Sequence, residues 1–132
     1  MIGVFAIIPQ RGKILLIRRG TMPFQDYWCP PGGVIDEGET AGEAVVRETI
    51  EETGIRVRVV EKLGDVTGPI TGRNQGVYLC TPMWGRAEPS PPEVTDVRWV
   101  SFDELPSLPI PPFIRRFLDD LDLGSFDNRS GK

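Results

Sequence analysis

The chain has 132 residues, a length that suits one domain with its own hydrophobic core. Its 39% hydrophobic and 26% charged residues are typical of a soluble globular protein, and its net charge of −4 includes no run of Lys and Arg that would favour duplex nucleic acid. The sequence contains no histidine, which excludes Ser-His and Cys-His catalysis and the usual zinc ligands, so acid–base or metal chemistry must depend on carboxylates.

The first part of the chain predicts strands and turns. Apolar runs at residues 2–8 and 13–18 flank Pro9-Gln10-Arg11-Gly12, a pattern typical of an antiparallel hairpin. The first run lacks the basic start and small-residue cleavage site of a signal peptide, and no run approaches membrane-spanning length. We therefore expect a cytoplasmic protein with no membrane partner. Residues 19–27 follow as a loop, and the segment WCPPGG at 28–33 predicts a rigid turn followed by a permissive one.

A helix is predicted over residues 41–53. Thr40 and Glu43 match a capping box at its start, and Gly54 supplies a glycine stop at its end. A rotation of 100° per residue turns one apolar face toward the interior, and Gly42 permits a close approach there. The residues expected on this inward face are Val45, Val46, Thr49 and Ile50.

The remaining chain adds further strands and a second helix. Strands are expected at 55–60 with an extension over 63–67, at 76–84 and at 94–100, with a loop at 68–75 and a helix at 111–121. Residues 125–132 predict a loose tail, which leaves a single domain over residues 1–124. Cys29 and Cys80 lie far apart beside apolar neighbours and are interpreted as buried free thiols. Strands with interposed helices and no internal repeat indicate an α/β fold.

Negative charge is concentrated between residues 33 and 55, which hold seven acids and one base, Arg47. Glu48, Glu51 and Glu52 lie on the outward side of the predicted helix and neighbour one another, because residues three and four apart stack on a helix surface. Each like-charge pair costs roughly 0.2–0.5 kcal/mol, and the negative end of the helix dipole disfavours anions further. A solvated acidic face is one interpretation, and a bound cation that neutralises the cluster is the other.

Ligands that are all oxygen favour a hard cation: Mg²⁺, Mn²⁺ or Ca²⁺. The acids lie on a helix rather than around a glycine turn, which argues against a calcium-binding EF-hand loop. Magnesium held by a few carboxylates usually keeps several waters and shares its coordination with substrate phosphates. The pattern therefore predicts a phosphorylated ligand.

The spacing of these residues resembles the Nudix box of the Nudix hydrolases. The segment PGG at 31–33, Glu39 and RETIEETGI at 47–55 stand at the family's spacing, and VRWVSFDEL at 97–105 is also similar to a family pattern. Thr49 departs from it, because the family prefers an aliphatic residue at that position. The resemblance implies a Nudix-type α/β/α sandwich in which a mixed sheet has helices on both faces.

The resemblance also implies a reaction and roles. Family members use a divalent metal and water to hydrolyse a nucleoside diphosphate linked to another group, so Mg²⁺ (or Mn²⁺) and a nucleotide substrate are expected. Arg47 would orient the glutamates, and Glu39 would support the loop–helix junction or a metal-bound water. Without histidine a glutamate is the expected base, and Glu52 is the first choice. The metal ligands implied by position are Glu48, Glu51, Glu52 and the carbonyl of Gly32.

Further candidates lie outside the box. The family often recruits a carboxylate from a later loop, for which Glu93 and Asp96 are the candidates, although both also fit surface charges beside a strand. Three aromatic residues fit base stacking, though loop aromatics more often pack, and three arginines fit phosphate contacts or a solvated surface. These candidate substrate-binding residues are Phe24, Tyr27, Trp28, Arg18, Arg19 and Arg73.

The short chain resembles MutT-like nucleoside triphosphate pyrophosphohydrolases of the housecleaning type. The ADP-ribose branch, which usually carries a proline about sixteen residues past the box, stays an alternative, because Pro69 precedes that position, Thr71, by two residues. A nucleotide-sensing module without turnover is the alternative of another class, and it would have no need of the complete acidic set. Related enzymes can be homodimers, but nothing in this sequence identifies an interface.

Overall fold

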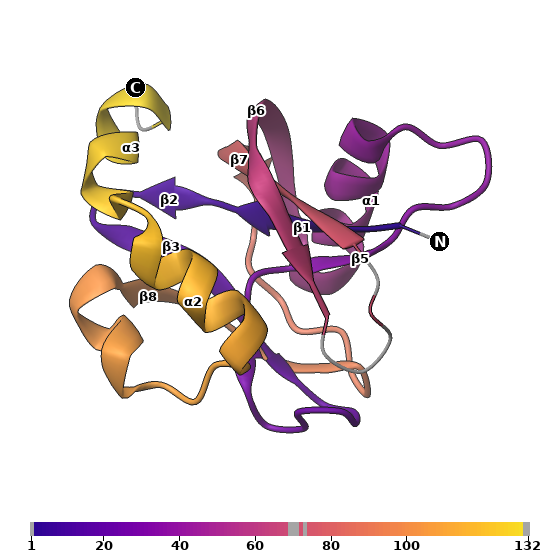
Figure 1. The fold of residues 1–132 in the computed structure, drawn as a ribbon, viewed down its shortest axis with the longest axis horizontal. Coiled ribbons are helices and arrows are strands. Elements are labelled where there is room, and N and C mark those ends of the chain that lie inside the picture. The colour runs from indigo at the N-terminus through magenta and orange to yellow at the C-terminus, as the bar shows by residue number, and fades with distance from the viewer. Residues whose placement is uncertain (1, 69–71, 73, 131–132) are drawn as a thin grey trace.

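The computed structural model describes residues 2–68, 72 and 74–130. Its elements in chain order are β1 (Gly3–Ile7), β2 (Pro9–Gln10), β3 (Lys13–Arg19), β4 (Trp28–Cys29), β5 (Gly32–Val34), α1 (Ala41–Thr53), β6 (Ile55–Thr67), β7 (Asn74–Gly85), β8 (Val94–Ser101), the 3-10 helix η1 (Phe102–Ser107), α2 (Pro112–Asp120) and α3 (Leu123–Ser130) (Figure 1). One sheet has the order β5-β1-β7-β6 and is mixed, because β1 and β7 run parallel while the other pairs are antiparallel. In the second sheet β3 pairs antiparallel with β2, β4 and β8.

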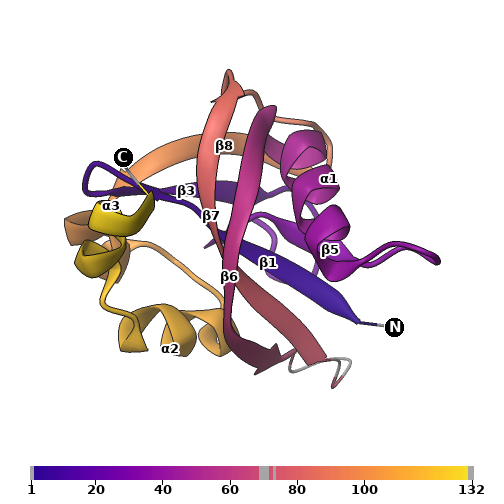
Figure 2. The same cartoon turned by 90° about the horizontal axis from the view of Figure 1, so that it is seen from above.

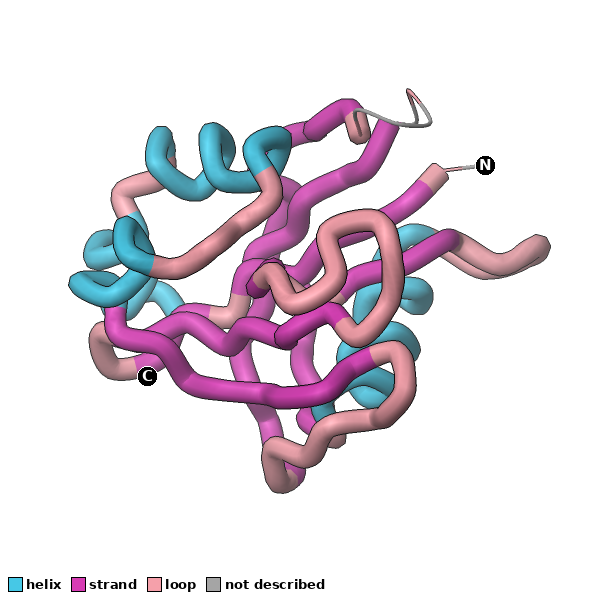
Figure 3. Tube along the Cα trace, turned by 90° about the horizontal axis from the view of Figure 1, so that it is seen from below, coloured by secondary structure: helices cyan, strands magenta, loops and turns pink. Residues whose placement is uncertain are grey.

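The inner strands are apolar along their whole length because helices cover both of their faces. Along β1, Phe5 and Ile7 belong to the core packed against α2 and α3, whereas Val4 and Ala6 belong to the core packed against α1. This alternation follows from the two-residue period of a strand. Figures 2 and 3 show the strands lying between α1 on one side and α2 and α3 on the other. The α/β/α sandwich with a mixed sheet is therefore confirmed.

The hairpin predicted at the N-terminus is shorter than expected. Its turn is correct, since β2 pairs with the start of β3 and places Pro9 opposite Ile14. β1 itself lies in the other sheet, where it pairs with β5 and β7. The segment at 28–33 was wrongly predicted as two turns: it contains β4 and the start of β5, because each finds a partner strand in a different sheet.

The C-terminal part also differs from the prediction. The helix expected at 111–121 is α2, but the loose tail expected over 125–132 is replaced by α3 as far as Ser130, and the predicted boundary at residue 124 falls inside this helix. Leu123 and Phe126 anchor α3, because both are buried in the larger core. Among the described residues, the helices are all too short or too polar to cross a membrane.

Helix α1 has the predicted ends. The Thr40 hydroxyl accepts the Glu43 amide at 3.1 Å, the Glu43 carboxylate accepts the Thr40 amide at 2.9 Å, and Gly54 closes the helix with a φ of 77°. The buried face is rotated from the one predicted, since Val46 is only half-buried and Ile50 is 38% exposed. The buried residues of α1 are Ala44, Val45, Thr49 and Thr53.

Two other predictions for buried positions have different outcomes. Gly42 does not serve a close approach, because a Cβ at this position would meet nothing within 4 Å. Cys29 and Cys80 are buried free thiols, as predicted. Burial raises the pKa of each thiol to about 12, so neither is a ready nucleophile.

Two buried threonines on α1 form a matched pair for a stability test. The hydroxyl of Thr53 donates to the Thr49 carbonyl at 2.7 Å and accepts the Ile55 amide at 3.1 Å, whereas the hydroxyl of Thr49 has no hydrogen-bond partner. Thr49→Val should therefore raise the free energy of unfolding by about 1 kcal/mol, because it removes an unsatisfied buried group. Thr53→Val should lower it by about 1 kcal/mol. Urea unfolding of both variants checks this, and a loss of stability in Thr49→Val would contradict it.

Candidate active site

The acidic side of α1 lies against β5. The amide of Gly32 donates to the Glu52 carboxylate at 2.7 Å, which joins the C-terminal turn of the helix to the strand. Gly33 covers Glu48 so closely that a Cβ on Gly33 would stand 2.4 Å from the Glu48 carboxylate. The two glycines thus bring a bare strand backbone onto two of the three glutamates, which is the close approach that a residue without a side chain permits.

Arg47 is the centre of the charge network. Its Nε and Nη2 donate to the two oxygens of Glu39 at 2.7 and 2.9 Å, and Nη1 donates to Glu48 at 2.7 Å and Glu51 at 2.8 Å. Nη2 also donates to the Val34 carbonyl at 3.0 Å, which ties the helix to β5. The planar guanidinium therefore fixes Glu39 in the loop before the helix and two glutamates on the helix at once.

The carboxylates of the site differ in pKa because they differ in burial and in hydrogen bonding. Burial raises the pKa of Glu52 to about 8, and the negative charges of Glu48 and Glu93 add to the rise while the Gly32 amide and Arg19 oppose it. Burial also raises the pKa of Glu48, against the hydrogen bond from Arg47. By contrast, the hydrogen bonds from Arg47 hold the pKa of Glu39 at about 2. Glu39 thus stays ionised near neutral pH beside Arg47, whereas burial favours the protonated form of Glu52.

Of the two later carboxylates, the structure brings only Glu93 to the cluster. Glu93 lines a hollow together with the glutamates of α1 and the turn that precedes β8, and its charge acts on Glu52. Asp96 lies on β8 opposite Arg18, where its carboxylate accepts the Val97 amide at 2.8 Å.

The donor set fits a hard cation, since it is made of carboxylates and carbonyls. In the described part of the chain, residues 2–68, 72 and 74–130, no three acids already converge on one point as metal ligands do. The reason is visible in the contacts: Arg47 holds one oxygen each of Glu48 and Glu51, and the Gly32 amide holds Glu52. Burial raises the pKa values of Glu48 and Glu52, although Arg47 donates to Glu48, and a divalent ion bound beside them would favour their charged forms.

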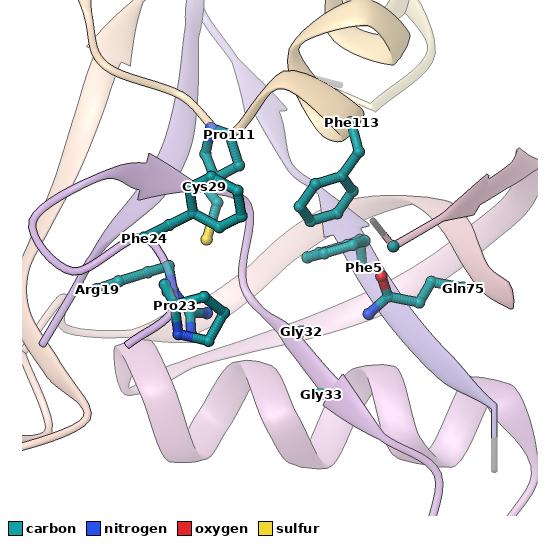
Figure 4. Close-up of a pocket in the computed structure, with 11 residues that line it drawn as sticks. Phe5, Arg19, Pro23, Phe24, Cys29, Gly32, Gly33, Gln75, Pro111 and Phe113 are labelled. Atoms are coloured by element: carbon teal, nitrogen blue, oxygen red, sulfur yellow. The ribbon is translucent and has the colours of Figure 1, made fainter. Parts of the chain in front are cut away.

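A second feature, an apolar pocket of about 190 Å³, opens on the face of β5 opposite α1 (Figure 4). Three rings border it: Phe113 on α2 lies 6.2 Å from Phe5 and 6.1 Å from Phe24, centroid to centroid. Phe24 has a left-handed backbone with a φ of 61°, and this conformation turns its ring into the pocket. The pocket is lined by Phe5, Arg19, Pro23, Phe24, Cys29, Gly32, Gly33, Gly68, Gln75, Pro111 and Phe113.

The predicted substrate-binding residues divide into two groups. Phe24 and Arg19 line the pocket, and Arg19 is held there by donating from Nε to the Pro23 carbonyl at 2.8 Å. Tyr27 packs edge-on against Phe24 and is not among the residues that line the pocket, and Trp28 is a buried core residue beneath the Arg98 guanidinium. Arg18 pairs with Asp26 instead, and Arg73 lies outside the described residues.

Phe5, Gln75 and Phe113 are among the pocket residues that were not predicted from the sequence. Phe5 is part of an apolar strand, Gln75 falls in a predicted loop, and Phe113 falls in a predicted helix, so each has an ordinary structural interpretation. The pairing of β1 with β7 brings the first two together, since Gly3 lies opposite Gln75 and Phe5 opposite Val77. Packing of α2 then adds the third ring.

Comparison with known proteins decides the family. The NUDIX domain model matches residues 1–121. The chain is a Nudix hydrolase. Its sequence is 33% identical over 126 residues to a Bacillus subtilis (strain 168) protein provisionally named an 8-oxo-dGTP diphosphatase, with 95% of this chain and 82% of the relative covered.

One further relative is named for a different substrate, and one solved structure has a similar fold. An ADP-ribose pyrophosphatase of Methanocaldococcus jannaschii is 46% identical over 68 residues, but the match covers only 52% of this chain and 40% of that protein. The crystal structure of a MutT protein from Methanosarcina mazei Go1 superposes with a TM-score of 0.75 at 27% identity and covers 100% of this Nudix hydrolase and 96% of that chain. Nudix hydrolases generally use divalent cations and act on small nucleotide substrates.

Substitution of each glycine of β5 distinguishes an effect on turnover from an effect on the stability of the fold. In Gly33→Ala the new Cβ displaces only the end of the flexible Glu48 side chain, so turnover should fall by about 10²-fold with little loss of stability. In Gly32→Ala the new Cβ would stand 2.1 Å from the Val4 carbonyl, so β1 and β5 must separate and stability should fall by about 1–3 kcal/mol. Turnover and thermal melts of both variants check this, and a Gly33→Ala variant with full activity would contradict it.

Proposed function

We propose that this Nudix hydrolase is a MutT-like pyrophosphohydrolase that converts a nucleoside or deoxynucleoside triphosphate to the monophosphate and pyrophosphate. The observation that carries the proposal is the position of β5 between two complementary features. On one face the pocket offers aromatic rings to a nucleobase, and on the other Glu48 and Glu52 lie against Gly33 and Gly32. A nucleotide with its base in the pocket would thus have its phosphates within reach of the carboxylates.

The proposed metal is Mg²⁺, with Mn²⁺ as the alternative. Glu48, Glu51, Glu52 and the carbonyl of Gly32 would hold it, in agreement with the all-oxygen preference of both ions. When bound, the ion would neutralise phosphate charge and acidify water. The carboxylate of Glu93, which lines the same hollow as these glutamates, is the proposed additional ligand.

Side chains of the protein would carry out proton transfer, orient the glutamates and contact the phosphates. Glu52 would accept a proton from the attacking water, whose oxygen bonds to phosphorus as the anhydride P–O bond breaks and pyrophosphate leaves. Arg47 and Glu39 would keep the other glutamates oriented, since Arg47 donates to Glu39 and Glu48 together. Arg19 lines the pocket and its charge opposes the rise in the pKa of Glu52, so it would contact a phosphate oxygen of a nucleotide bound there.

A substrate panel tests the proposal. Purified protein is incubated with Mg²⁺ and with each of the common triphosphates, ADP-ribose and a dinucleoside polyphosphate, and the products are separated by ion exchange. Release of monophosphate and pyrophosphate supports the proposal. Release of AMP and ribose 5-phosphate from ADP-ribose would support the alternative suggested by the 46% identity to the archaeal ADP-ribose pyrophosphatase. Tight nucleotide binding without any product would instead indicate a nucleotide-sensing module.

A further inference from the structure

Gln75 is a polar side chain in an otherwise largely apolar pocket. It is the second residue of β7, opposite Gly3, and Gly3 lacks the Cβ that would stand 3.0 Å from the Gln75 side chain. Figure 4 shows its amide pointing toward Phe5 at the wall of the cavity. Within residues 2–68, 72 and 74–130 this amide has no hydrogen-bond partner, so its donor and acceptor are both available to a ligand.

The pocket suits one ring system. Its volume of about 190 Å³ lies below the roughly 300–1,000 Å³ typical of pockets that enclose a whole drug-sized ligand. Phe5, Phe24 and Phe113 supply apolar walls against which a planar ring can stack. A nucleobase is the part of a nucleotide that fits such a site, with the amide of Gln75 at its edge.

A glutamine amide forms two hydrogen bonds to a base edge only when a donor stands beside an acceptor. Adenine offers this pattern, because N6–H donates and N7 accepts. Guanine presents O6 and N7, which both accept, so the Gln75 oxygen would face an acceptor. Oxidation of guanine at C8 places a proton on N7, which restores a donor beside the acceptor O6. The unpartnered amide can turn over to suit either order.

We propose that Gln75 determines base specificity: it reads the N7 edge of a purine and selects adenine and 8-oxoguanine nucleotides over guanine nucleotides. This inference rests on the proposed function, because it assumes that a nucleotide base occupies the pocket. It assigns the substrate class of the same site to a residue outside the Nudix box.

The test compares kcat/KM for dATP, 7-deaza-dATP, dGTP and 8-oxo-dGTP in the unmodified enzyme, in Gln75→Met and in the control Gln10→Met on β2. In the unmodified enzyme and the control, dATP and 8-oxo-dGTP should exceed dGTP by about 10–100-fold, and 7-deaza-dATP, which lacks the N7 acceptor, should fall about 10-fold below dATP. In Gln75→Met these ratios should shrink to within about threefold, mainly through KM, with kcat little changed. Calorimetric titration of the metal-free protein with dAMP and 7-deaza-dAMP should show the same difference without turnover.

The outcomes separate the two proposals. If no triphosphate is hydrolysed, the proposed function fails. If triphosphates are hydrolysed but dGTP is used as well as 8-oxo-dGTP, or the preferences persist in Gln75→Met, only the role of Gln75 is overturned. The deaza analogue probes the same contact in the unmodified enzyme, so the test does not depend on whether Gln75→Met folds.

Discussion

The variant Glu52→Gln should lose turnover by about 10²–10⁴-fold, the usual contribution of a positioned general base. Glutamine keeps the size of the side chain and an oxygen that can accept the Gly32 amide, which lies 2.7 Å from Glu52. It can neither take a proton nor carry a charge. The fold should therefore persist while the chemical step fails.

The control for this variant is Glu104→Gln. Glu104 is an exposed glutamate that pairs with Arg98 at 3.2 Å, outside the hollow formed by the α1 acids, and its loss should leave turnover within about twofold. Initial rates at saturating Mg²⁺ and circular dichroism of all three proteins make the comparison. Full turnover in Glu52→Gln would remove Glu52 from the mechanism.

The unmodified protein and Glu52→Gln should also differ in how their stability depends on pH when no metal is present. Because the native pKa of Glu52 is raised from 4.5 to about 8, the native carboxyl keeps its proton between these values while the unfolded chain has lost it. The free energy of unfolding should thus fall as pH rises through this window and level off above it, with a limiting slope of roughly 1.4 kcal/mol per unit that solvent access reduces. Glu39, with a pKa of about 2, titrates below the window, whereas Glu48, whose pKa burial also raises, adds to the slope in the same direction.

Urea unfolding between pH 5 and 9 with a chelator present measures this slope, which should be much smaller in Glu52→Gln. Equal slopes in the two proteins would show that Glu52 ionises normally. Because a cation favours the carboxylate, Mg²⁺ binding near pH 7 should also release a proton, which calorimetry in buffers of different ionisation enthalpy detects.

The parts of the site that the sequence predicts are local in the chain. Helix α1 was predicted with correct ends because the Thr40–Glu43 capping box and Gly54 act within a few residues of the ends they form. The grouping of Glu48 with Glu51 and Glu52 follows from helical spacing alone. The network around Arg47 extends beyond the helix, to Glu39, which is eight residues away, and to the Val34 carbonyl, which is thirteen residues away.

The base pocket could not be predicted because its residues meet through tertiary structure. Phe5, Gln75 and Phe113 come from three elements far apart in the sequence, and each fits its own element without reference to the others. The same limit explains the strand β5: two glycines and a proline favour a turn locally, but pairing with β1 overrides that preference. Likewise α3 forms where the sequence predicted a loose tail, because Phe126 is buried in the core.

Arg47→Ala should reduce both stability and turnover, which distinguishes Arg47 from Glu52. Removal of the guanidinium leaves Glu39, Glu48 and Glu51 without the donor that they share. The Arg47 side chain is 28% exposed, between a surface and a buried pair, so the free energy of unfolding should fall by about 2 kcal/mol. Turnover should fall by about 10²-fold, because the freed glutamates no longer hold one geometry.

Arg47→Lys provides the sharper form of the experiment. Lysine keeps the charge but has no planar fork, so it cannot donate at once to Glu39 in the loop, to the helix glutamates and to the Val34 carbonyl. It should recover part of the stability, since charge repulsion is relieved, but little of the turnover. Arg58→Ala, an exposed arginine on β6, is the matched control and should change neither. If Arg47→Lys restored full turnover, charge alone would suffice, and the positioning role of the guanidinium would be wrong.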